Sequence, residues 1–145
     1  MKKYVIIICL VIIFILGFIF YPKNTTKREL ITELTPLECD LNKSACQVNY
    51  KNKKIIFEFD EKPLKILKET KVIIKNLEKF DNLNAKLYGL NMYMGDIISE
   101  FEYINNEYVG TLVFSSCIES TMRYRFELFD GKKELGIFID FDVKR

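Results

Sequence analysis

Apolar and polar residues alternate with a period of two through most of the chain beyond residue 34. Between Met122 and Leu128, for example, every second side chain is apolar and the side chains between them are charged. Alternation of this kind is typical of antiparallel strands with one buried and one solvated face. It predicts strands over residues 35–40, 44–50, 53–60, 70–77, 84–91, 97–104, 107–115, 121–129 and 134–142.

Short polar turns separate these runs. Asp130-Gly131, between two alternating segments, is the strongest hairpin signal. Further turn signals are Asn42-Lys43, Lys51-Asn52 and Asn105-Asn106. Many short strands with closely spaced turns are typical of an immunoglobulin-like β-sandwich, which we expect over residues 35–145. A small closed barrel is the alternative.

The start of the chain has a different pattern, because Tyr4 to Tyr21 contains no charged residue. At 1.5 Å per residue a helix of this length just crosses a bilayer core of roughly 30 Å. The stretch ends without the small residues of a signal-peptidase site, so residues 4–21 are predicted to be an uncleaved signal anchor. Residues 1–3 would be cytoplasmic, and the polar residues 22–34 would form a stalk. A cleaved signal peptide and a free domain are the alternative.

Charge indicates where the domain lies. Lys2 and Lys3 are the only charges before residue 22, so the positive-inside rule keeps that end in the cytoplasm. We therefore expect a single-pass protein of the bacterial inner membrane, with its C-terminal domain in the periplasm. The rest of the chain has equal numbers of basic and acidic side chains. A formally neutral domain is a poor candidate for nucleic-acid binding, which needs a basic face.

Histidine is absent from the chain. Ser-His-Asp and Cys-His catalysis and His-ligated zinc are therefore excluded. No C-x-x-C pair is present either, which argues against a thiol oxidoreductase. The sequence predicts a protein that is not an enzyme.

Three of the four cysteines lie in the predicted domain. Cys39 and Cys46 flank a polar turn and are the natural disulfide pair in an oxidising compartment. A bridge from either of them to Cys117 is the alternative, because spacing alone does not fix connectivity.

The sulfur atoms are candidates for metal chemistry. Counting strand reversals from the stalk places the Cys39/Cys46 turn, the loop with Met92 and Met94, and the Cys117 loop at one end of the domain, facing away from the bilayer. Met122 follows one residue into the next strand. Thiolate and thioether ligands select Cu(I), so Met92, Met94, Cys117 and Met122 form a candidate Cu(I) site. The alternative is that the methionines pack in the core and that Cys117 is an inert thiol or a disulfide partner.

Three short motifs carry a resemblance to known proteins. They are Cys39-Asp40-Leu41 with Cys46, Met92-x-Met94-Gly95, and Cys117 followed by Met122-x-Tyr124. Here the chain resembles anchored periplasmic proteins that are distantly similar to FixH/YtkA-like immunoglobulin-type domains, although Tyr124 replaces their usual Trp. The resemblance covers roughly residues 37–142. It implies an immunoglobulin-like fold, a periplasmic location and a link to respiratory-oxidase assembly or copper handling.

The function expected from the sequence is that of a membrane-anchored binding or assembly domain that acts through the sulfur-rich end on a membrane protein partner. The more specific version of this expected function is the binding of Cu(I). The alternative is a metal-free protein-interaction module of the cell envelope.

Overall fold

The computed structural model describes residues 11, 28 and 30–145 of the chain. The predicted cytoplasmic residues, the anchor except residue 11 and most of the stalk lie outside this description. In the described part, no helix has the length and apolarity needed to cross a membrane. The predicted division into anchor, stalk and domain therefore remains a prediction.

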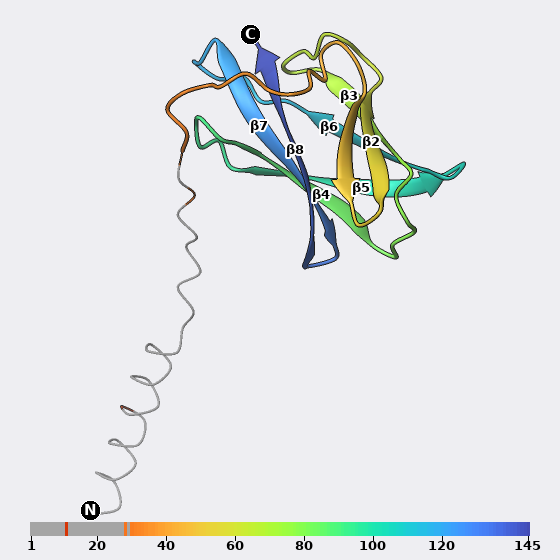
Figure 1. The fold of residues 1–145 in the computed structure, drawn as a ribbon. Coiled ribbons are helices and arrows are strands. Elements are labelled where there is room, and N and C mark those ends of the chain that lie inside the picture. Colours follow the sequence, from red (N-terminus) through yellow and green to blue (C-terminus); the bar gives the residue numbers. More distant parts are fainter. Residues whose placement is uncertain (1–10, 12–27, 29) are drawn as a thin grey trace, which may run out of the picture.

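The described residues fold into eight β-strands that are all antiparallel to their neighbours (Figure 1). They are hydrogen-bonded in one sheet, in the order β1-β2-β3-β6-β5-β4-β7-β8. The strands are β1 (Cys46–Tyr50), β2 (Lys53–Phe59), β3 (Glu69–Lys75), β4 (Leu83–Gly89), β5 (Asp96–Ile104), β6 (Glu107–Val113), β7 (Thr121–Asp130) and β8 (Lys133–Lys144). The prediction of an all-β domain is confirmed.

The strand order contains two overlapping Greek keys. β4, β5 and β6 form a meander, with β7 beside β4 and β3 beside β6. The sheet curls so that its outer strands, β1 and β8, approach each other and nearly close it. The finer assignment to an immunoglobulin-like sandwich remains a prediction.

β5 turns the corner of this sheet. Its first half pairs with β4 up to Glu100, and its second half pairs with β6 from Phe101 onward. Gly110 lies opposite Phe101, where a Cβ atom would come within 2.8 Å of the Phe101 ring and 2.9 Å of the Glu100 carbonyl oxygen. Only a glycine leaves room for this close approach.

Eight of the nine strands predicted from the alternation are present, with ends shifted by a few residues. The ninth, over residues 35–40, is wrong, because this segment has bends and no ladder pairing. Pro36 has no N–H to donate to a ladder. Asp40 instead accepts hydrogen bonds from Asn42 and shapes the turn that follows.

The predicted turns are confirmed at several hairpins. Asn105 and Asn106 both adopt positive φ, at 51° and 65°, as expected of a two-residue hairpin turn. At the β7–β8 hairpin, Gly131 has φ of 58° and follows directly on Asp130. The residue types at these turns therefore determine the backbone conformation of the connections.

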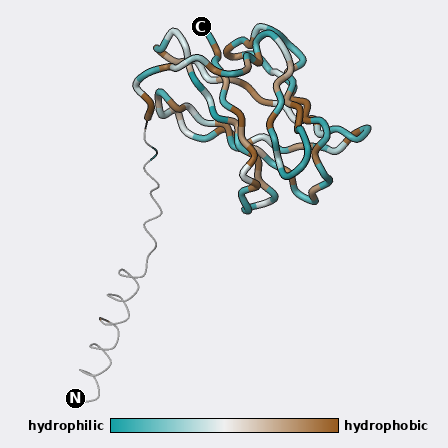
Figure 2. The backbone as a smooth tube through the Cα atoms, viewed as in Figure 1, coloured by the Kyte–Doolittle hydropathy of each residue, from teal (hydrophilic) through white to brown (hydrophobic). Residues whose placement is uncertain are grey.

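The core is rich in aromatic side chains, which come from inward positions on both halves of the sheet. The Phe141 ring on β8 stacks with that of Tyr124 at 6.1 Å and lies 5.3 Å from that of Phe59 on β2. Figure 2 shows hydrophobic segments recurring along the strands and hydrophilic ones at many of the turns. Aromatic pairs of this kind add to the stability gained from burial. The buried aromatic residues include Phe57, Phe59, Tyr108, Phe114, Tyr124, Phe126 and Phe141.

The connections fall into two groups at opposite ends of the sheet. One end carries the two-residue turns β1–β2, β5–β6 and β7–β8 and the longer β3–β4 connection over residues 76–82. The other end, here called the sulfur end, is formed by loops 60–68, 90–95 and 114–120, together with the turn before β1 and the end of β8. The cysteines and methionines of the domain lie at this second end.

Candidate sulfur site at one end of the sheet

Two of the predicted site residues touch each other. The Cys117 thiol lies 3.0 Å from the Met92 sulfur, with the thiol as donor. The contact joins loop 90–95 to loop 114–120. Both side chains are partly buried and pack against the hydrophobic core. A thiol and a thioether therefore lie side by side, on two loops that the reversal count placed at the same end of the domain.

Gly89 allows loop 90–95 to approach the core. A Cβ atom at this position would lie 2.3 Å from the Met92 carbonyl oxygen and 2.9 Å from the Met122 methyl carbon. Met122 itself is buried and belongs to the core cluster. The backbone of Met92 and the side chain of Met122 therefore both approach residue 89, which has no side chain.

Beyond the end of β4, the side chains of residues 92–94 alternate between partly buried and exposed. Met92 and Met94 are partly buried against the core, whereas the side chain of Tyr93 is exposed. Both methionines therefore lie on the inner side of this loop. Met94 lies two residues after Met92 in the same loop, and the buried Met122 approaches Gly89 at the end of β4.

The buried Tyr124 lies close to Cys117 of the sulfur pair. Its hydroxyl donates to the Ser115 carbonyl at 3.4 Å. Burial raises the pKa of the Tyr124 phenol above its ordinary value, and the nearby Cys117 sulfur adds to this shift. The phenol therefore stays neutral and supports loop 114–120 as a hydrogen-bond donor.

Loop 90–95 is held against β7 by Asn91, a residue that no local sequence pattern singles out. The Asn91 side chain accepts from the Arg123 N–H at 2.9 Å and donates to the Thr121 carbonyl at 2.9 Å. The Leu90 N–H also donates to the Arg123 carbonyl, at 2.7 Å. These bonds continue the β4–β7 pairing past the end of the ladder and position Met92.

Arg123 joins β7, β8 and the segment before β1. Its guanidinium donates two hydrogen bonds to Asp142, at 2.8 and 2.9 Å, and one to the Thr35 carbonyl, at 2.6 Å. Asp142 lies directly across the ladder, as does Asp140 across from Arg125. Both arginines are therefore cross-strand charge partners of aspartates on β8.

The chain enters the domain at the sulfur end. The Ile31 N–H donates to the Leu90 carbonyl at 2.8 Å, and the Arg28 guanidinium pairs with Asp96. The reversal count began with a strand over residues 35–40 and so placed this end away from the incoming chain. That strand is absent and Ile31 lies at this end, so the count gives no reason to direct the end away from the incoming chain, although the grouping of the loops is right.

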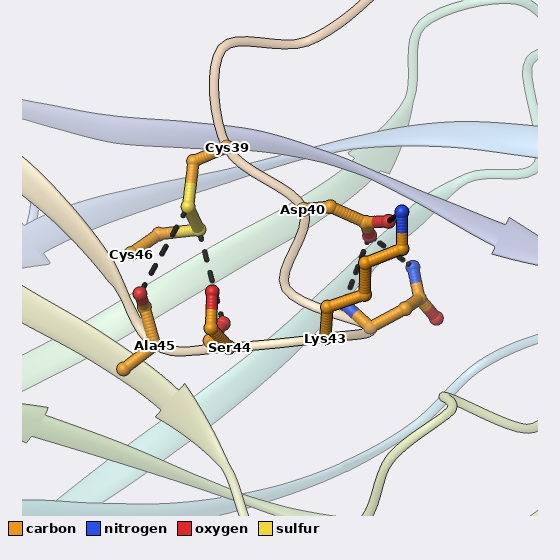
Figure 3. Close-up of a disulfide and its surroundings, with 7 residues drawn as sticks. Cys39, Asp40, Lys43, Ser44, Ala45 and Cys46 are labelled. Carbon is orange, nitrogen blue, oxygen red and sulfur yellow. Dashed lines mark hydrogen bonds and ion pairs between the residues drawn. A yellow bond between two sulfur atoms is a disulfide. The ribbon is translucent and has the colours of Figure 1, made fainter.

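Cys39 and Cys46 form the disulfide at this end, with their Cα atoms 5.9 Å apart (Figure 3). Cys117 is the unpaired cysteine among residues 30–145. The predicted Cys39–Cys46 pairing therefore fits the structure, and the bridges to Cys117 do not.

The disulfide closes a loop that is also held from within. The carboxylate of Asp40 accepts from the backbone and the side chain of Asn42, at 3.0 Å each. These hydrogen bonds lower the pKa of Asp40 below its ordinary value. The Asn42 amide also donates to the Asp142 carbonyl at 2.8 Å, which ties the loop to β8.

The donor set of the candidate site consists of sulfur. In the described part of the chain, no group of three or more His, Cys, Asp or Glu residues is arranged to hold a metal ion. The Met92–Cys117 pair contains only one such residue, so its chemistry depends on a thioether as well. Soft donors of this kind fit Cu(I) and do not fit hard cations such as Mg²⁺ or Ca²⁺.

No protein-family model, curated protein or solved structure matches this chain. The resemblance to FixH/YtkA-like domains therefore remains a prediction from the sequence.

Proposed function

We propose that the chain is a non-enzymatic, membrane-anchored binding or assembly domain of the bacterial cell envelope that binds Cu(I) through Cys117 and Met92. In this proposal residues 4–21 are the anchor, and residues 35–145 form an immunoglobulin-like domain in the periplasm. The respiratory-oxidase link implied by the resemblance would make a membrane protein the recipient of the copper.

The contact of 3.0 Å between the Cys117 and Met92 sulfurs is the observation that carries the proposal. Two soft donors on different loops already lie together, so little reorganisation is needed for both to reach one ion. Met94 and Met122 are the nearest further thioethers and complete the predicted ligand set. The Cys39–Cys46 disulfide supports an oxidising compartment such as the periplasm.

A competition titration tests the binding. The full chain carries Cys9→Ser, so that Cys117 is its one remaining free thiol when the disulfide is closed. It is titrated anaerobically with Cu(I) and ascorbate against a colorimetric Cu(I) chelator, without thiol reagents that would open the disulfide. We expect one Cu(I) per chain, and loss of that copper in the Met92→Leu/Met94→Leu double variant.

Cys117→Ser is the companion variant. The hydroxyl is similar in size to the thiol but is a hard donor, so we expect Cu(I) affinity to fall by at least about tenfold, or about 1.4 kcal/mol. Copper binding that is equally tight in this variant would contradict the proposal.

The metal-free interaction module is the second candidate. It is favoured by the packing of Met92, Met94 and Cys117 against the hydrophobic core, which is ordinary for these residue types. A protein partner that is captured equally well by the wild type and by the Met92→Leu/Met94→Leu variant, with no copper bound to either, would support this alternative.

A further inference from the structure

The three most exposed large apolar side chains among the described residues lie at the sulfur end. They are Ile118, Tyr93 and Leu67, whose exposed fractions are 82%, 70% and 70%. Each belongs to a different loop, 114–120, 90–95 or 60–68. Single exposed apolar residues are common, but a group of them at one end of a domain marks an interaction surface.

The contact between the sulfurs brings the loops of two of these side chains together. Tyr93 directly follows Met92, and Ile118 directly follows Cys117. Because Met92 and Cys117 touch, Tyr93 and Ile118 are each one residue away from the same contact, and both are exposed. Leu67 is held nearby, since its N–H donates to the carbonyl of Phe114 at the start of the Cys117 loop, at 2.9 Å.

The surface around Tyr93 and Ile118 has little charge. Loop 90–95 contains no charged residue, and loop 114–120 contains only Glu119. Few ionic groups would lose water if these loops entered an apolar or interfacial environment, and the desolvation cost would be correspondingly low. Tyrosine is also one of the residues that favour the headgroup region of a bilayer.

The incoming chain ties this end to the apolar segment at residues 4–21. Arg28 is held against the domain by Asp96 and by the ring of Tyr88, whose centroid is 3.7 Å from the guanidinium carbon. Seven residue steps separate Tyr21 from Arg28. A fully extended chain covers at most about 25 Å in seven steps. The end that carries Tyr93 and Ile118 therefore remains close to the point at which residues 4–21 end.

We infer that the sulfur end rests on the surface of the membrane that holds residues 4–21, with Tyr93, Ile118 and Leu67 in the interfacial layer. The partner that contacts this apolar surface is thus a phospholipid bilayer. The inference rests on the anchor of the proposed function and adds an orientation to it: the Met92–Cys117 pair faces the plane of the membrane.

Because the chain contains no Trp, a single introduced Trp is its only indole emitter. Four full-chain variants, Tyr93→Trp, Ile118→Trp, Ile104→Trp and Phe18→Trp, are reconstituted into phosphatidylcholine vesicles with and without brominated acyl chains. Ile104 is the matched control, since it is 45% exposed and lies at the end of β5 remote from the sulfur end. Phe18 reports on the anchor alone.

We expect bromine quenching and a blue-shifted emission at positions 93, 118 and 18, and neither effect at position 104. Quenching of the Trp at position 18, with none at positions 93 and 118, would contradict the docking of the sulfur end and would support the anchor. Quenching at 93 and 118 with none at 18 supports the docking and overturns the anchor. A blue shift at 93 without quenching shows that a protein, such as a second copy of the chain, covers this surface, and also overturns the docking.

Discussion

Arg123 and Asp142 face each other directly across β7 and β8, and two hydrogen bonds join the guanidinium to the carboxylate. The alternation of β7 places Arg123 on its outer face, yet only 4% of this residue is exposed. The segment before β1 covers it and supplies the Thr35 carbonyl as a third acceptor. The pair therefore joins the entering chain to the last two strands.

Removing the charge of Asp142 leaves Arg123 buried without its ionic partner. We expect Asp142→Asn to lower the free energy of unfolding by about 2–3 kcal/mol. Asp140→Asn is the matched control, since it breaks the same kind of pair one step along the ladder, where the side chain of Arg125 is 31% exposed. Its cost should be about 0–1 kcal/mol. Equal losses in urea denaturation would show that burial of Arg123 does not determine the strength of the pair.

Gly89 is predicted to control the position of Met92. An added Cβ would meet the Met92 carbonyl, which belongs to the backbone and cannot rotate away. We expect Gly89→Ala to cost about 1–3 kcal/mol of stability and to weaken Cu(I) binding, because loop 90–95 has to move. Calorimetry and the chelator competition measure the two effects.

Gly110→Ala is the control for that substitution. Its Cβ would also meet a neighbouring strand, but at the β5 corner and not at the sulfur end. A similar loss of stability with unchanged Cu(I) affinity is expected. If both variants lost copper equally, the effect would come from general destabilisation and not from the position of Met92.

The Arg28–Asp96 pair is predicted to protect the entering chain from trypsin. Asp96→Asn keeps the cleavage sites at Lys27 and Arg28 intact and removes the charge that holds Arg28 on the domain. Faster cleavage at these two sites is expected than in wild type, as measured by mass spectrometry of the fragments. Asp81→Asn, an exposed change near the start of β4, should leave the rate unchanged.

The same pair gives a pH dependence with a definite sign. The hydrogen bonds from Arg28 lower the pKa of Asp96 below its ordinary value of 3.8. The stability that the carboxylate supplies is therefore present above pH 3.8 and is lost as the pH falls through the lower pKa of the folded state. The difference in unfolding free energy between wild type and Asp96→Asn should be constant from pH 6 to about pH 4 and should shrink below it. A difference that grows on acidification would contradict this assignment.

Much of the fold follows from local signals in the sequence. The period of two along residues such as Met122 to Leu128 predicts the strands, and the positive φ of Asn105 and Asn106 agrees with the turn predicted there. The pairing of β3 with β6 and of β4 with β7 could not be derived in this way, because it joins strands that are far apart in sequence. Near closure of the sheet depends on those non-local pairs.

The sequence predicts which residue types form the candidate site, but it predicts only partly where they lie in the fold. The lack of His directs attention to the sulfurs, and counting strand reversals brings Met92 and Cys117 to one end. The contact of Thr35 with Arg123 could not be foreseen, since no local pattern shows that an irregular segment folds back over β7. That contact, together with those of Ile31 and Arg28, holds the entering chain at the sulfur end.

X-ray absorption at the copper K edge tests the central claim most directly. The sample is the full chain carrying Cys9→Ser and loaded with one equivalent of Cu(I). Because the chain contains no His, the proposal predicts a first shell of sulfur scatterers alone, with sulfur scattering reduced in both Cys117→Ser and Met92→Leu. A first shell of nitrogen or oxygen atoms, or a sulfur shell unchanged in both variants, would contradict binding by the Met92–Cys117 pair.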